Sequence, residues 1–167
     1  MTAAAALPSF DPARQLDIAR RAIARQSFCV LATSSAEHRP HAVGVLYAAV
    51  DWTLYLAVGE GSVKVRNIRA NPNVAVSIPV RRYPFAPPMA VQFQGTAEIL
   101  AGTDPHVREL LAAGRLKRIA TAASLDRPET CVIKVVPGRR IATYGLGISL
   151  RRLLREVTQG ARRVELP

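Results

Sequence analysis

Hydrophobic and polar residues alternate along most of the chain, and the period of that alternation divides it into elements. Residues 11–26 repeat apolar positions at helical spacing, which predicts an amphipathic helix. Asp11 suits the N-cap of this helix and Pro12 suits its first helical position. The stripe expected to be buried comprises Leu16, Ala19, Ala22 and Ile23.

After residue 27 the period changes to that of β-strands. Strands are expected over residues 28–35, 41–50, 53–58, 73–80, 89–100, 130–136 and 139–145. The last two are expected to pair as a hairpin around Pro137-Gly138. Helices are predicted over 63–70 and 103–124, a proline-stiffened loop (RRYPFAPP) over 81–88, and a basic tail over 146–167 that is partly helical around SLRRLLREV.

Short turns join most of the expected strands, so neighbouring strands should run antiparallel. The strand total and the absence of βαβ alternation favour a closed or partly closed barrel over a doubly wound sheet. The fold class predicted is therefore mainly β, an antiparallel barrel with peripheral helices. The chain of 167 residues suits a single domain, 1–167, with a core over about 25–147 and a basic C-terminal tail over 148–167.

Composition adds the expected environment of this barrel. With 49% hydrophobic and 21% charged residues the chain is typical of a folded protein, and neither a signal peptide nor a membrane-spanning run is evident, so a cytoplasmic location is expected. Cys29 and Cys131 each lie in an apolar strand and are expected to be buried free thiols. The formal net charge of +11 favours anionic partners: nucleic acid, phosphorylated small molecules or acidic lipid.

The chain carries few patterns that indicate catalysis by side chains. His38, His41 and His106 have no partner at metal-ligand spacing, so no metal is expected. There is no nucleophile elbow, no glycine-rich dinucleotide loop and no phosphate-binding P-loop. If the protein is an enzyme, a cofactor is expected to supply the chemistry.

One stretch, EGSVKVRNIRANPNVAV at 60–76, concentrates polar chemistry. Ser62 suits the N-cap of a short helix over 63–70, which Asn71-Pro72 should end. The N–H groups of the first turn, the helix dipole and Lys64 would together suit a phosphate. On pattern alone, a solvated basic helix crossing one end of a barrel is the more common explanation.

The order of elements resembles the pyridoxamine 5′-phosphate oxidase-like FMN-binding split-barrel superfamily, including its actinobacterial flavin- and deazaflavin-dependent oxidoreductases. The matching stretches are FCVLATSSAEHRPHAVGVLY, LYLAVGEGSVKVRNIRANPNVAV, VQFQGTAEIL and a final strand ending TYGL, most of residues 25–147. The second is the most specific: a strand, a small-residue turn, Lys-x-Arg-Asn-aliphatic and then Asn-Pro.

The resemblance implies a split barrel of six to seven strands that forms a homodimer, with a flavin-type cofactor in each of two grooves at the interface. Ser62, Val63 and Lys64 would lie at the cofactor phosphate, Arg66 would add positive potential, and Asn67 would brace the loop through backbone bonds. The residues implied to line the ring are His41, Val43, Gly44 and Val58, and Gln94 is implied to come from the partner subunit. The implied chemistry is hydride transfer to or from a small organic substrate, with no side-chain acid or base required.

The cofactor and the function are open between several alternatives. FMN carries one phosphate, whereas F-420 adds an acidic tail that Lys64, Arg66, Arg69 and other arginines would favour, so F-420 is preferred slightly over FMN. Oxidation of pyridoxamine phosphate is not expected, because GRRIATYG does not supply the arginine-histidine element of the vitamin B6 oxidases. The alternatives are a non-catalytic carrier of flavin, deazaflavin or haem, and a basic nucleic-acid-binding barrel. The last is disfavoured because aromatic residues are only 5% and scattered.

Overall fold

The protein was analysed as a computed structural model that describes residues 10–80, 89–149 and 160–166. Its helices are α1 (Pro12–Arg25), α2 (Val63–Ala70), α3 (Pro105–Ala112) and α4 (Lys117–Ala122). Its strands are β1 (Phe28–Ser34), β2 (Pro40–Leu46), β3 (Ala48–Val50), β4 (Thr53–Gly59), β5 (Asn73–Val80), β6 (Met89–Ala101), β7 (Thr130–Tyr144) and β8 (Ala161–Glu165).

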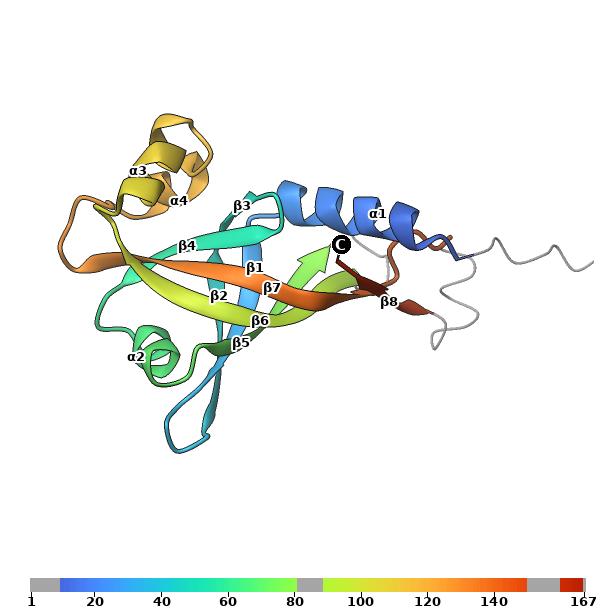
Figure 1. Cartoon of the computed structure of the whole chain (residues 1–167), viewed down its shortest axis with the longest axis horizontal. Coiled ribbons are helices and arrows are strands. Elements are labelled where there is room, and N and C mark those ends of the chain that lie inside the picture. The colour runs from blue at the N-terminus through green and yellow to red at the C-terminus, as the bar shows by residue number, and fades with distance from the viewer. Residues whose placement is uncertain (1–9, 81–88, 150–159, 167) are drawn as a thin grey trace, which may run out of the picture.

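All the strands belong to one antiparallel sheet that curls into a split barrel. The strand order is β2-β1-β5-β6-β7-β4-β3, and β8 pairs with β7 outside this path. The long strands β6 and β7 connect the two halves of the curl (Figure 1). The fold class predicted from the sequence is therefore confirmed. The described residues form eight strands where seven were predicted: β3 and β8 are additional, and β7 joins two strands that were expected to be separate.

The core is the apolar interior of this curl, closed by α1. Ala19, Ala22 and Ile23 are buried as the helical stripe predicted, and Asp11 caps the helix by accepting from the Ala13 and Arg14 amides. Gln15 is also buried on α1, where its amide donates to Thr143 Oγ1 (2.8 Å) and to the Leu146 carbonyl (3.1 Å). Because its polar atoms are bonded, this buried glutamine fixes α1 against β7 without leaving an unsatisfied group.

Two predicted elements are each divided into two by the structure. The strand expected over 41–50 forms two strands, β2 and β3, which are separated at Tyr47. The Tyr47 side chain is fully buried, and its hydroxyl donates a hydrogen bond to the Ile23 carbonyl (2.7 Å). The helix expected over 103–124 is α3 and α4. Gly114 adopts φ +72° between them, a left-handed conformation that ends a helix and favours glycine.

The hairpin expected around Pro137-Gly138 is wrong. Residues 130–144 are one continuous strand, β7, whose first part pairs with β4 and whose last part pairs with β8. The turn-forming residues instead belong to a bulge, because the pairing with β6 steps from Phe93↔Ile141 to Gly95↔Pro137. The backbones approach closely here, and a Cβ on Gly95 would lie 2.2 Å from the Val136 carbonyl oxygen.

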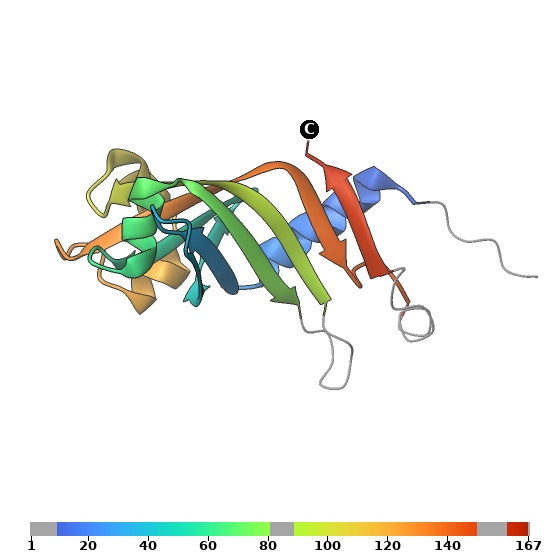
Figure 2. The ribbon, with the colours of Figure 1, turned by 90° about the horizontal axis from the view of Figure 1, so that it is seen from below.

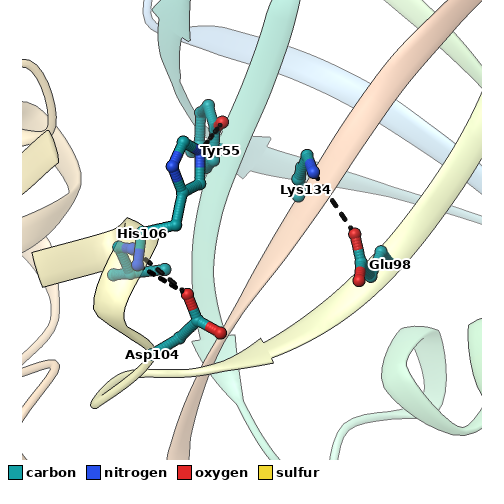
Figure 3. A network of polar contacts seen from close by, with 6 residues as sticks. Tyr55, Glu98, Asp104, His106 and Lys134 are labelled. Carbon is teal, nitrogen blue, oxygen red and sulfur yellow. Dashed lines mark hydrogen bonds and ion pairs between the residues drawn. The ribbon is translucent and has the colours of Figure 1, made fainter. Parts of the chain in front are cut away.

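The helices α3 and α4 cover the outer side of β3, β4 and β7 (Figures 1 and 2). Asp104 caps α3, and the Tyr55 hydroxyl shares a hydrogen bond of 2.8 Å with His106 Nε2 (Figure 3). On the strands beside Tyr55, Lys134 pairs with Glu98 (3.4 Å). The Tyr55–His106 bond fixes α3 at the end of the sheet that also carries α2.

The basic tail contributes a strand that the sequence pattern did not predict. Residues 161–165 form β8, which pairs with β7 from Arg140↔Glu165 to Tyr144↔Ala161. Val164 of β8 is buried in the core, so this part of the tail completes the fold. Of the helix predicted over 149–157, residues 150–157 lie outside the described residues.

Candidate cofactor-binding site

The helix α2 begins with polar groups that the protein itself leaves unsatisfied. Ser62 occupies the N-cap position, as predicted, but its side chain makes no capping hydrogen bond. Its Oγ is buried and has no hydrogen-bond partner among the described residues. Because the N–H groups of the first turn have no partner within a helix, the start of α2 offers both a hydroxyl and backbone donors to a ligand.

The cations on α2 are not equivalent. Arg69 forms an ion pair with Glu60, and this pair holds the pKa of the Glu60 carboxyl below its usual value. Lys64 is half-buried and Arg66 is exposed, and in the described part of the chain neither forms an ion pair. The start of α2 therefore keeps positive charge near Ser62, while the charge of Arg69 is neutralised internally.

Asn67 braces α2 against the sheet, although not through the backbone bonds that were expected. The side chain is 6% exposed, and its amide donates to Thr33 Oγ1 on β1 at 3.0 Å. Thr33 lies opposite His41 of β2 and donates weakly to the His41 carbonyl (3.5 Å). Asn67 and Thr33 thus connect the predicted phosphate-binding helix with the strand predicted to line the cofactor ring.

The three predicted residues on β2 lie on two faces of the sheet. His41 and Val43 share a face with their register partners Thr33 and Leu31, which are buried. Gly44 lies on the opposite, open face, where a Cβ would come within 2.6 Å of the Phe28 ring. A single planar ligand would therefore contact either the face of β2 that carries His41 and Val43 or the face that carries Gly44. Of the predicted residues on β2, only His41 and Val43 offer the ligand side chains.

Two buried side-chain polar atoms lack a hydrogen-bond partner within residues 10–80, 89–149 and 160–166, namely His41 Nδ1 and Ser62 Oγ. Both belong to residues predicted to bind the cofactor. An unsatisfied buried group destabilises a protein by about 1–3 kcal/mol, so such groups are usually satisfied by a ligand, an ion or water. The donor chemistry at these positions fits a phosphate-bearing polar cofactor.

The remaining predicted residues are placed differently. Val58 is 8% exposed and belongs to the core, whereas Val63 is 42% exposed on the first turn of α2. Gln94 is exposed on the open face of β6 and lines two adjoining grooves there, one of which also includes Asn71 at the end of α2. Its contribution from a partner subunit stays a prediction.

Sequence reasoning missed two residues that shape this site. Thr33 is a hydroxyl on the apolar face of a strand, and that exception to the alternation was a usable signal. Glu60 is the one carboxylate in the stretch 59–72, so it was the natural partner for one of the nearby cations. Among the described residues no group of three or more His, Cys, Asp or Glu side chains is placed to hold a metal, and no helix is long and apolar enough to cross a membrane.

Residues 17–143 match the protein family described as pyridoxamine 5′-phosphate oxidase. The chain belongs to this family. No curated protein matches it. The pyridoxamine 5′-phosphate oxidase resemblance expected from the residues is thereby confirmed at the level of the family and of the split-barrel fold.

Solved structures of the family fold resemble the chain over most of its length at low identity. A heme-binding protein from Mycobacterium smegmatis has a TM-score of 0.71 and 20% identity, and the match covers 90% of this chain and 57% of that one. An FAD-binding protein from Mesorhizobium loti has a TM-score of 0.60 and 18% identity over 74% and 88% of the two chains. A protein named F420 reductase has a TM-score of 0.52 and 24% identity over 71% and 92%. The chain thus spans little more than half the length of the mycobacterial protein, and these likenesses show the fold alone.

Proposed function

We propose that the protein binds a flavin-type cofactor at α2 and transfers a hydride between that cofactor and a small organic substrate. The observation that carries this proposal is the coincidence of the two unsatisfied buried atoms, His41 Nδ1 and Ser62 Oγ, with predicted cofactor contacts. Membership of the pyridoxamine 5′-phosphate oxidase family supports it, as do relatives of the same fold that are named for FAD and F420.

In this proposal Ser62, the first-turn amides of α2 and Lys64 bind the phosphate. Ser62 Oγ donates to a phosphate oxygen, and the Lys64 ammonium provides a charge-assisted bond that is stronger than a neutral one. Arg66 adds positive potential from the exposed side of the helix. Asn67 keeps α2 in register with β1 through Thr33, so it positions the anchor without touching the ligand.

His41 and Val43 are proposed to lie against the cofactor ring. When bound, the flavin or deazaflavin supplies the hydride chemistry, and the barrel residues orient the ring and exclude water from one of its faces. His41 Nδ1 would gain the polar partner that it lacks among the described residues. F-420 is preferred over FMN because Lys64 and Arg66 have no ion pair with the described residues. The acidic tail of F-420 would provide carboxylates for these two cations, which FMN does not have.

A second copy of the chain is proposed to pack on the open face of the sheet, the face opposite His41 and Val43. Phe28 and Leu46 are register partners that are 44% and 48% exposed, and they form an apolar patch on the open face beside Gly44. A second copy would remove this patch from water and bring its own Gln94 toward the first copy. Light scattering should give a dimer, and Leu46→Asp should shift it toward monomer. A wild-type monomer at micromolar concentration would refute the proposed dimer.

The deciding experiment is a parallel fluorescence titration of the purified protein with FMN and with F-420. Binding at micromolar Kd or tighter of either ligand supports the proposal, and the preferred ligand identifies the cofactor. Binding of neither would refute the flavin-type site. Reduction of a substrate panel with the bound, reduced cofactor then tests turnover separately from binding.

A second candidate function is cofactor carriage without turnover. The fold relatives include proteins named for heme binding, and the structural likeness to one of them reaches a TM-score of 0.71. A hemin titration followed by absorbance tests this alternative in the same buffer. Tight hemin binding together with no binding of FMN or F-420 would favour the carrier over the oxidoreductase.

A further inference from the structure

The helices α1 and α4 bring two basic segments of the chain together on one side of the barrel, away from α2 (Figure 1). Arg118, in the first turn of α4, donates through Nη1 to the Gln26 carbonyl (2.9 Å) and weakly to the Ala24 carbonyl (3.4 Å). These carbonyls lie at the end of α1, where the helix dipole is negative and favours a cation. The contact therefore joins the end of α1 to the start of α4, although the bonded residues are 92 and 94 positions apart in the chain.

Both segments are rich in cations and poor in carboxylates. The helix α1 carries four arginines and a single carboxylate, Asp17. Residues 113–122 carry three cations and no carboxylate. We call the exposed cations of these two segments the basic surface; they are Arg14, Arg20, Arg21, Arg25, Arg115, Lys117 and Arg118.

Most of the charge on the basic surface is left without a carboxylate partner. Asp17 forms ion pairs with Arg20 and Arg21, so one negative charge is shared between two cations. Arg118 bonds only to backbone carbonyls among the described residues, and these do not neutralise its charge. The cations of the surface that form no ion pair with any described residue also include Arg14, Arg25, Arg115 and Lys117.

Three of these arginines form a row along α1. Arg14, Arg21 and Arg25 are separated by seven and four residues, so they share one face of the helix. At 1.5 Å per residue the row is about 16 Å long, a length over which each strand of a DNA duplex carries roughly five phosphates. Arg25 lies between Ala24 and Gln26, whose carbonyls Arg118 bonds, so the cations of α4 lie beside the end of the row.

We propose that the basic surface binds the phosphate backbone of double-stranded nucleic acid without reading its sequence. Cations supply most of such sequence-independent affinity, and the formal net charge of +11 adds to it. The scarcity of aromatic residues argues against stacking on single strands, but backbone contacts need no aromatic side chain. A lipid surface fits less well, because apolar side chains must enter it. None of the exposed large apolar side chains among the described residues belongs to α1 or α4.

The test is fluorescence anisotropy of a labelled 20-base-pair DNA duplex titrated with the full chain. About four phosphate contacts should raise the Kd roughly a hundredfold between 50 and 200 mM salt. The double variant R25Q/K117Q should raise the Kd at 50 mM salt roughly tenfold or more and lower the salt slope by about two, one for each lost contact. The matched control R39Q/R139Q removes the same charge from the β1–β2 turn and from the β7 bulge, where both arginines are exposed, and should change the Kd less than about threefold. Thermal unfolding establishes that each variant is folded.

Two further titrations separate the alternatives. A second duplex of unrelated sequence should bind with the same Kd, and vesicles of phosphatidylserine and phosphatidylcholine should bind more weakly than either duplex at equal salt. The proposal is overturned if the wild-type protein does not bind the duplex at 50 mM salt, or if R25Q/K117Q binds it like wild type. Equal weakening by R39Q/R139Q overturns it as well, because total charge and not the basic surface would then decide. Vesicle binding that exceeds duplex binding and is lost in R25Q/K117Q would assign the surface to lipid instead.

Discussion

Replacing Lys64 with alanine tests the phosphate anchor most directly. The substitution removes the ammonium next to Ser62 at the start of α2, where the described residues provide no carboxylate to neutralise it. A hydrogen bond to a charged group contributes about 1.5–3 kcal/mol, so the Kd for FMN or F-420 should rise roughly 10- to 150-fold. Because Lys64 makes no ion pair with the described residues, unfolding of the cofactor-free variant should change little.

The matched control is Arg69→Gln, which removes a cation from the same helix. Arg69 is already paired with Glu60, so its charge is neutralised before a ligand binds, and its loss should raise the Kd much less than the loss of Lys64. Loss of an exposed pair of this kind should lower the stability by only about 0.2–1 kcal/mol. Fluorescence titration of both variants with both ligands measures the difference. If Lys64→Ala binds as tightly as wild type, α2 is not the anchor. If both variants weaken binding equally, only the overall charge of the helix matters.

Three further predictions concern stability. Ile68→Ala should lower the free energy of unfolding by about 2–5 kcal/mol, because Ile68 is 3% exposed against the core, and urea denaturation measures this loss. Gly95→Ala should cost about 1–3 kcal/mol in the same assay, since its Cβ would lie 2.2 Å from the Val136 carbonyl oxygen; an unchanged midpoint would contradict the close approach at the bulge. Burial raises the pKa of the Cys29 thiol from 9.0 to about 12, so the folded state keeps the thiol neutral where the unfolded chain ionises, and stability should fall as pH rises from 9 toward 12 by up to about 1.4 kcal/mol per pH unit. Cys29→Ala should reduce that slope, and an identical pH dependence in the variant would contradict it.

Local patterns were enough to predict the barrel and the anchor helix. The alternation in β1, β5 and β6 and the boundaries of α2 follow from neighbouring residues, so they were visible in the chain. The role of Ser62 as the first residue before α2 was also predictable. The lack of a hydrogen bond from its hydroxyl to the described residues was not predictable, because it depends on which distant residues pack over the start of the helix.

The errors arose where tertiary contacts override local signals. Pro137-Gly138 is typical of a turn, yet β6 is long enough to pair on both sides of it, and the pair is absorbed as a bulge. Tyr47 fits a strand, but the Ile23 carbonyl at the end of α1 draws its hydroxyl into the core. Three of the residues 161–165 are charged, and only the open side of β7 makes this segment a strand. None of these partners is near in sequence.

The pairing of β8 with β7 also affects how the protein associates. Without β8, residues 140–144 of β7 would present a row of unpaired backbone N–H and C=O groups along one side. Such an exposed edge is a template on which another chain can add a strand, the usual start of domain swapping and aggregation. Pairing with β8 therefore covers this edge of β7 and prevents another chain from adding a strand there.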